Sequence, residues 1–136
     1  MKAQILVAGA EGAGAALVLA APISFWGGVE PANGVVIDTR HPDHGARLAG
    51  KVLFLPGTVG SSSASSVLLE LVHNGNAPAA IVMHEPDAIL LLGLVVAREM
   101  GWETPVSVQL DKERFTDFAG RHVRVGTDGE LAVSDA

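Results

Sequence analysis

An apolar run, a glycine turn and a cluster of serines follow one another in the middle of the chain. Residues 51–55 (KVLFL) predict a buried strand, and residues 67–72 (VLLELV) carry apolar side chains at helical spacing. Between them lie the turn 56–60 (PGTVG) and the serine-rich segment 61–66 (SSSASS). This order predicts several hydroxyls and free backbone N–H groups at the start of a helix. Because such a helix end attracts negative charge, it can bind an anion or stabilise an alkoxide.

The serine cluster has two interpretations. One helix needs only one capping side chain, whereas Ser61, Ser62 and Ser63 are consecutive. Either Ser61 caps the helix and the other serines are solvated residues of its first turn, or the cluster takes part in binding and chemistry. The turn is not a nucleotide-binding phosphate loop, because that motif has a lysine after its last glycine. Here Ser61 takes that place, which excludes nucleoside triphosphate hydrolysis.

The composition of the whole chain limits its partners. Its 136 residues predict one domain, and 49% are hydrophobic while only 18% are charged. The mean hydropathy of +0.37 fits either a surface hidden against a partner or a core rich in alanine and valine. The net charge of −6 and the lack of a basic patch exclude nucleic acid as a partner. Without cysteine, this chain by itself cannot hold an iron–sulfur cluster through thiolates.

The apolar N-terminal region resembles a signal peptide only in part. Residues 13–23 are apolar, and Lys2 precedes them. However, Glu11 and three nearby glycines interrupt the run, and residues 2–8 already predict a strand. We therefore expect a cytoplasmic protein, and no apolar segment is long enough to span a membrane.

The hydrophobic pattern predicts a layered α/β domain over residues 1–136. A glycine-rich turn at 10–14 is expected to join the first two strands as a pair, and irregular loops are expected at 22–33 and 38–45. Alternating strands and helices in the middle predict a small parallel sheet with right-handed crossovers, and the strand-rich ends predict antiparallel additions and a partly closed sheet. We expect strands at 4–8, 15–20, 35–37, 52–55, 79–83, 105–108, 121–125 and 130–133, the last two as a hairpin, and helices at 61–74 and from 86 or 87 to about 100.

The histidines offer no convincing metal site. His41 and His44 are three residues apart, but Pro42 favours a loop rather than a helix there, and no third strong ligand lies nearby. A role in a substrate loop or a subunit contact is a better interpretation for this pair. His84 and Glu85 follow a strand and could line a cleft, although turn polarity before a helix is the better interpretation. Asp87 is read as the N-cap of that helix.

Two aromatic residues stand next to each other in a chain with few aromatics. Phe25 and Trp26 precede Gly27 and Gly28, and the glycines allow another surface to approach the backbone closely. The aromatic side chains either close the base of the core or face a partner. We expect at least one of them to face a partner or a cleft, and we assign residues 25–28 to an interface or cleft.

Several short segments, taken in order, resemble the small swivel-type subunit of the aconitase X family. They extend over about residues 2–110 and are PISFWGGV at 22–29, VID at 36–38, HP at 41–42, GKVL at 50–53, Pro56 with GS at 60–61, and NGNAPAA at 74–80. The resemblance implies a swivel domain, a layered β/β/α fold with a partly closed mixed sheet. It also implies a large subunit that holds an iron–sulfur cluster, with which the small subunit acts as a hydro-lyase (dehydratase).

The resemblance assigns roles to the serine turn. The catalytic serine of the family is the first one after the loop glycine, which corresponds to Ser61, and we expect Gly60, Ser62 and Ser63 to contact the substrate. The family acts on cis-3-hydroxy-L-proline or on mevalonate 5-phosphate. Archaeal relatives often have a basic residue just before the loop glycine, where this chain has Val59. This difference favours cis-3-hydroxy-L-proline, because a phosphate is usually paired with lysine or arginine.

Two classes of function remain open on the sequence. The first is the small subunit of a cis-3-hydroxy-L-proline dehydratase, inactive alone, or, as its alternative, of mevalonate 5-phosphate dehydratase. The second is a non-enzymatic or regulatory module that binds an anion at the serine turn. We expect no metal bound by this chain alone, a small hydroxy acid as substrate, and neither nucleic acid nor membrane as a partner.

Overall fold

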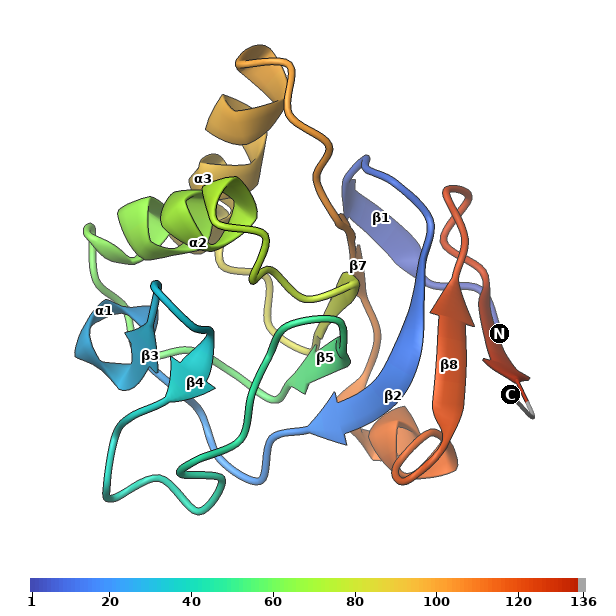
Figure 1. The fold of residues 1–136 in the computed structure, drawn as a ribbon. Helices are drawn as coiled ribbons and strands as arrows, with labels where there is room; N and C mark the ends of the chain where they lie inside the picture. The colour runs from blue at the N-terminus through green and yellow to red at the C-terminus, as the bar shows by residue number, and fades with distance from the viewer. Residues whose placement is uncertain (135–136) are drawn as a thin grey trace.

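A curled sheet forms the body of the domain in the computed structural model, which describes residues 1–134 (Figure 1). Its strand order is β1–β7–β6–β5–β2–β8–β9. Strands β2, β5, β6 and β7 run parallel to their neighbours in this series, while β1, β8 and β9 are antiparallel additions at the two ends. The bounds are Gln4–Val7 for β1, Gly12–Val18 for β2, Val52–Leu55 for β5, Ala80–Met83 for β6, Val106–Gln109 for β7, His122–Val125 for β8 and Leu131–Ser134 for β9.

Two helices cover one face of this sheet. Helices α2 (Ala64–His73) and α3 (Ala88–Glu99) pack against each other on the side of the molecule opposite β8 (Figure 1). The short α1 (Phe25–Gly28) and the hairpin of β3 (Val29–Glu30) and β4 (Val35–Val36) lie beside α2. Within the described chain no helix has both the length and the apolar character to cross a membrane.

The central strands separate two hydrophobic cores. Every residue of β5 is buried, and successive side chains of a strand point to opposite faces. Leu53 therefore belongs to the core under α2 and α3, whereas Phe54 belongs to the core inside the curl of the sheet. There the ring of Phe54 lies 5.2 Å from that of Phe115, in the 3₁₀ helix η1 (Lys112–Asp117), and 5.5 Å from that of Phe118.

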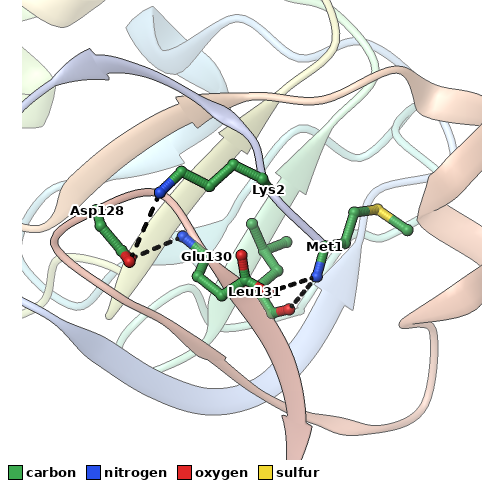
Figure 2. A network of polar contacts seen from close by, with 5 residues as sticks. All are labelled: Met1, Lys2, Asp128, Glu130 and Leu131. Carbon is green, nitrogen blue, oxygen red and sulfur yellow. Dashed lines mark hydrogen bonds and ion pairs between the residues drawn. The ribbon is translucent and has the colours of Figure 1, made fainter.

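The first residues of the chain close the sheet on itself. The Ala3 N–H donates to the Gly129 carbonyl (2.9 Å), and the Leu131 N–H donates to the Met1 carbonyl (2.7 Å). The N-terminal ammonium group donates to Glu130 Oε1 at 2.8 Å, and Figure 2 draws this contact as a dashed line. These contacts join the end of the sheet that carries β1 to the end that carries β9. The expected partly closed sheet is confirmed.

Among the carboxyl groups of residues 1–134, only one in the turn at the closure has a clearly shifted pKa. The Glu130 N–H donates to Asp128 Oδ1 (3.0 Å), and this hydrogen bond lowers the pKa of Asp128 below its usual range (Figure 2). Lys2 Nζ, 3.6 Å from Asp128 Oδ2, acts in the same direction. A carboxyl group whose pKa is lower in the folded state stabilises the fold above its unfolded-state pKa, and that contribution disappears as the pH falls through its folded-state pKa.

We predict that Asp128→Asn lowers the urea midpoint slightly at about pH 7, because the variant loses the charge that the turn and Lys2 favour. As the pH falls below the usual aspartate pKa of about 4 and through the lowered pKa of Asp128, the gap between variant and wild type should close. Urea titrations across this range provide the measurement. A gap that stays constant with pH would show that the carboxylate charge contributes nothing to the closure.

The expected N-terminal hairpin is wrong. Strand β1 pairs with β7, and β2 lies between β5 and β8. The glycines that predicted a turn belong to β2 and serve close packing instead. A Cβ atom on Gly12 would lie 1.9 Å from the Ala79 carbonyl oxygen, and one on Gly14 would lie 2.1 Å from that of Gly50. The glycines therefore allow neighbouring backbone to approach the strand, so β2 begins at Gly12 rather than at 15.

Other expected elements hold with shifted bounds. Helix α2 begins at Ala64, three residues later than expected, because residues 62–63 form a turn. The expected irregular loop at 22–33 contains α1 and β3, although Trp26 and Gly27 have non-helical backbone angles. The N-cap role of Asp87 is confirmed, since its Oδ1 accepts the Leu90 N–H (3.0 Å). The C-terminal hairpin is also confirmed, as β8 and β9.

Candidate functional site

The serine turn lies at the carboxyl edge of the parallel strands. Strand β5 leads into residues 56–63, and the neighbouring β6 leads into residues 84–87. Because parallel strands end at the same edge, the two connections lie side by side, and this edge is where open α/β sheets bind ligands. The His84 N–H donates to the Leu55 carbonyl (3.0 Å), which holds the two connections together at their start.

Two further contacts fix the loop before the serines. The Val59 N–H donates to the Ile23 carbonyl (3.0 Å). The Thr58 hydroxyl donates to Asp87 Oδ2 (2.6 Å), while the other oxygen of Asp87 caps α3. The loop is thus held to the chain before α1 on one side and to the start of α3 on the other. Such supports limit how far Ser61 can move.

Ser61 lies just before α2, with its side chain half-buried. Its Oγ accepts the N–H of Ser63 (3.2 Å), and its carbonyl accepts the N–H of Ala64, the first residue of the helix (3.1 Å). Across residues 1–134, the Ser63 N–H is the only group that hydrogen-bonds to Ser61 Oγ. The hydroxyl proton is therefore available, and a negative charge on Oγ would meet an N–H donor and the positive end of a helix.

The neighbouring serines differ in their contacts. Ser63 directly precedes α2 but makes no capping hydrogen bond with its side chain. The serine side chain that accepts an N–H at this helix start is that of Ser61, so the capping interpretation of Ser61 remains open. Ser66, inside the helix, donates its hydroxyl to the Ser63 carbonyl (2.7 Å). Ser62 is exposed. The structure therefore brings Ser61, Ser62 and Ser63 together at the helix end, where Ser61 Oγ accepts one N–H of the turn and Ser63 makes no side-chain capping bond.

Nothing inside the domain requires a glycine at position 60. Its φ is not positive, and a Cβ atom there would have no heavy atom within 4 Å. A glycine in open space next to Ser61 is consistent with the close approach of a ligand or another chain.

An open hollow of about 320 Å³ lies between the α1–β3 segment and α2. Trp26 and Gly27 line it from one side, and Ser66 and Glu70 from the other. The Trp26 side chain is 58% exposed. Two of the residues expected at an interface or cleft, Trp26 and Gly27, therefore lie at the surface next to the helix that follows the serine turn.

For Phe25 and Gly28 the expected interface role is wrong. Phe25 is 1% exposed and belongs to the core under the helices. Gly28 is buried, and a Cβ atom on it would meet the Ile23 side chain at 3.3 Å. The sequence could not tell which of the two aromatic residues is buried, because that depends on the irregular backbone at Trp26, which turns the two adjacent side chains in opposite directions.

We predict opposite effects for the two aromatic residues. Phe25→Ala should lower the free energy of unfolding by about 3–5 kcal/mol, because it leaves a cavity in the core. Trp26→Ala should cost less than about 1 kcal/mol, because the ring is mostly in solvent. Urea denaturation of the two variants compares them directly. Equal losses of stability would contradict the assignment of Trp26 to the surface.

His41 has a structural role. It is 6% exposed, its Nδ1 accepts the Asp43 N–H (3.0 Å), and its Nε2 therefore carries the proton and donates to the Ala21 carbonyl (3.0 Å). The substrate-loop or subunit-contact interpretation is wrong for this side chain, because both ring nitrogens are bound inside the domain. His44 is exposed. In residues 1–134, histidine and carboxylate side chains nowhere gather in a group of three that could hold a metal.

The sequence analysis missed one residue at this edge, Thr58, and preferred a bland interpretation for another, His84. Thr58 supports the loop through Asp87, but no local pattern marks a contact between residues 29 positions apart. His84 was read as turn polarity. Its Nδ1 accepts the Lys112 N–H (3.0 Å), which places its remaining proton on Nε2. A side chain held in this way after a parallel strand is a candidate for contact with a ligand at the same edge.

Known proteins resemble this chain over nearly its whole length. The family model described as the aconitase X swivel domain matches residues 1–133. The cis-3-hydroxy-L-proline dehydratase of Pseudomonas aeruginosa is 46% identical over 94% of this chain. The phosphomevalonate dehydratase small subunit of Thermococcus gammatolerans is 35% identical over 95% of this chain and 94% of its own length. The crystal structure of Thermococcus kodakaraensis aconitase X in its holo form has a TM-score of 0.83, with 30% identity, 98% of this chain covered and 97% of that chain.

The relatives differ greatly in length. This chain spans 22% of the length of the P. aeruginosa enzyme but nearly all of the T. gammatolerans small subunit. The matched region is therefore one part of a longer polypeptide in the first case and a separate subunit in the second.

Proposed function

This chain belongs to the aconitase X swivel-domain family, and on that premise we propose that it forms the small-subunit part of an iron–sulfur hydro-lyase. The proposed reaction is the dehydration of a small hydroxy acid, with cis-3-hydroxy-L-proline as the first candidate substrate and Ser61 as the catalytic base. The observation that carries the proposal is the place of Ser61, accessible at the carboxyl edge of β5 and at the start of α2.

The proposed reaction needs a base next to a carboxylate. Dehydration of a β-hydroxy acid removes the proton α to the carboxylate and expels the hydroxyl group. Ser61 Oγ, as an alkoxide, would take that proton, and the N–H of Ser63 together with the end of α2 would stabilise its charge. A serine hydroxyl is a weak acid and needs an activating group. Because no base within the described chain hydrogen-bonds to Ser61 Oγ, the proposal places this group on the partner.

This chain does not fit an iron–sulfur cluster. It has no cysteine, and its described histidines and carboxylates form no ligand group. We therefore assign the cluster to the large subunit and the serine turn to the small subunit. A complete site then requires both parts.

The residue before Gly60 supports the choice of substrate. Val59 is 57% exposed and uncharged, so this chain offers no cation there for a phosphate. The similarity to the P. aeruginosa enzyme supports the same choice. Mevalonate 5-phosphate remains the second candidate, because a phosphomevalonate dehydratase small subunit matches this chain along nearly its whole length. Both substrates belong in the same assay.

We predict that the purified chain alone does not dehydrate cis-3-hydroxy-L-proline or mevalonate 5-phosphate, because it supplies only part of the site. Adding the large subunit should restore turnover of one of them. Product formation is followed by mass spectrometry with and without the large subunit. Turnover by the isolated chain at the rate of the complex would rule out the division of the site between two parts.

We predict that Ser61→Ala lowers kcat of the assembled enzyme by about 100-fold or more, the usual contribution of a general base. The fold should lose about 1 kcal/mol or less, because only one hydrogen bond to Ser61 Oγ disappears. Ser62→Ala removes an expected substrate contact but not the base, so it should lower kcat far less than Ser61→Ala. If Ser62→Ala abolishes turnover while Ser61→Ala retains it, the base is assigned to the wrong serine.

A further inference from the structure

Helix α3 has an apolar outer surface that no part of residues 1–134 covers. Residues 88–97 (AILLLGLVVA) carry no charged or polar side chain. The inner side packs on α2 and the sheet, but Ile89, Leu92, Val95, Val96 and Met100 are between 42% and 55% exposed. We call these five residues the α3 patch. A helix that is apolar on all sides is normally buried on all sides, so the patch indicates a missing neighbour.

A groove leads from the α3 patch to the first turn of α2, which directly follows the serine turn. Asp87, the N-cap of α3, is bound to Thr58 in the loop that leads to Ser61. Farther along the helix, Gly93 touches α2 so closely that a Cβ atom on it would lie 2.5 Å from the Ser65 carbonyl oxygen. Beside this contact runs an open apolar groove of about 240 Å³, lined by Ser65, Ser66, Leu69, Leu92, Gly93 and Val96. The groove joins the patch to the first turn of α2.

We propose that the α3 patch is the surface on which the large subunit docks. The inference rests on the proposed function, since a partner that completes the site at Ser61 must cover the start of α2. The patch begins at that point, so the same partner would lie over Leu92 and Val96. The partner surface should itself be apolar and uncharged, because it faces the five uncharged side chains of the α3 patch.

Two other occupants fit the surface less well. Helices that lie on membranes carry lysine and arginine beside their apolar face, whereas Arg98 is the only basic residue of α3 and the chain has a net charge of −6. A second copy of this chain would cover the groove at Ser65 and Ser66. It would then block the partner that the serine turn requires.

The test compares two valine-to-glutamate variants of similar exposure. Val96 in the α3 patch is 43% exposed, and Val133 in β9 is 39% exposed. Strand β9 pairs with β8, on the opposite side of the domain from α3 (Figure 1). Each variant and the wild type are titrated with the purified large subunit of the same enzyme in a calorimeter. Thermal melting of each free chain first shows that the fold is intact, and Leu92→Glu serves as a second patch variant.

We expect Val96→Glu and Leu92→Glu to raise the Kd for the large subunit by about tenfold or more, as for a central interface residue. Val133→Glu should leave the Kd unchanged. If the wild type binds and both patch variants bind equally well, the α3 patch is not the docking surface, while the proposed function stands. If the wild type binds no large subunit, both the docking inference and the proposed function fail. If the free wild type self-associates and Val96→Glu abolishes that self-association, the patch binds a second copy of this chain and the inference is overturned.

Discussion

All side chains of β5 and β6 are buried, so both faces of these strands must be covered by other parts of the chain. Helices α2 and α3 cover one face. The other face is covered by the curl of the sheet itself, with Phe115 and Phe118 packed on Phe54. The curl is completed where the residues around Ala3 meet the turn at Gly129. The layers and the closure of the sheet follow from this two-sided burial.

The same arrangement places the serine turn. Parallel strands β5 and β6 deliver their following loops to one edge, and the helices that cover the sheet must begin there. Ser61 therefore lies next to a helix start, with Asp87 of the adjacent connection supporting its loop through Thr58. In our proposal this site is one half of an active site, and the large subunit supplies the other half.

The excess of apolar residues is divided between the interior and the surface. The two cores account for most of the large apolar side chains, yet α3 still presents apolar residues to solvent. The sequence left open whether the high hydropathy reflects a rich core or a surface hidden against a partner. The structure shows a rich core and, in addition, an exposed apolar side of α3. Because a regular helix turns 100° per residue, a run of ten apolar residues inevitably places some of them on the outer side.

The sequence by itself determined the elements whose signals are local. Alternating apolar runs and turn residues predicted the parallel strands, the capped helix after Asp87, the C-terminal hairpin and the serine turn at a helix start, because each depends on neighbours within a few residues. Only the tertiary structure decided the use of Gly12 and Gly14, since a close approach by Ala79 and Gly50 leaves no local trace. It also decided that Phe25 faces the core while Trp26 faces solvent, and that His41 is bound by its own loop and by Ala21. In each of these cases the outcome depends on a contact with residues distant in sequence or on an irregular backbone angle. Neither a distant contact nor a backbone angle can be read from the order of residue types.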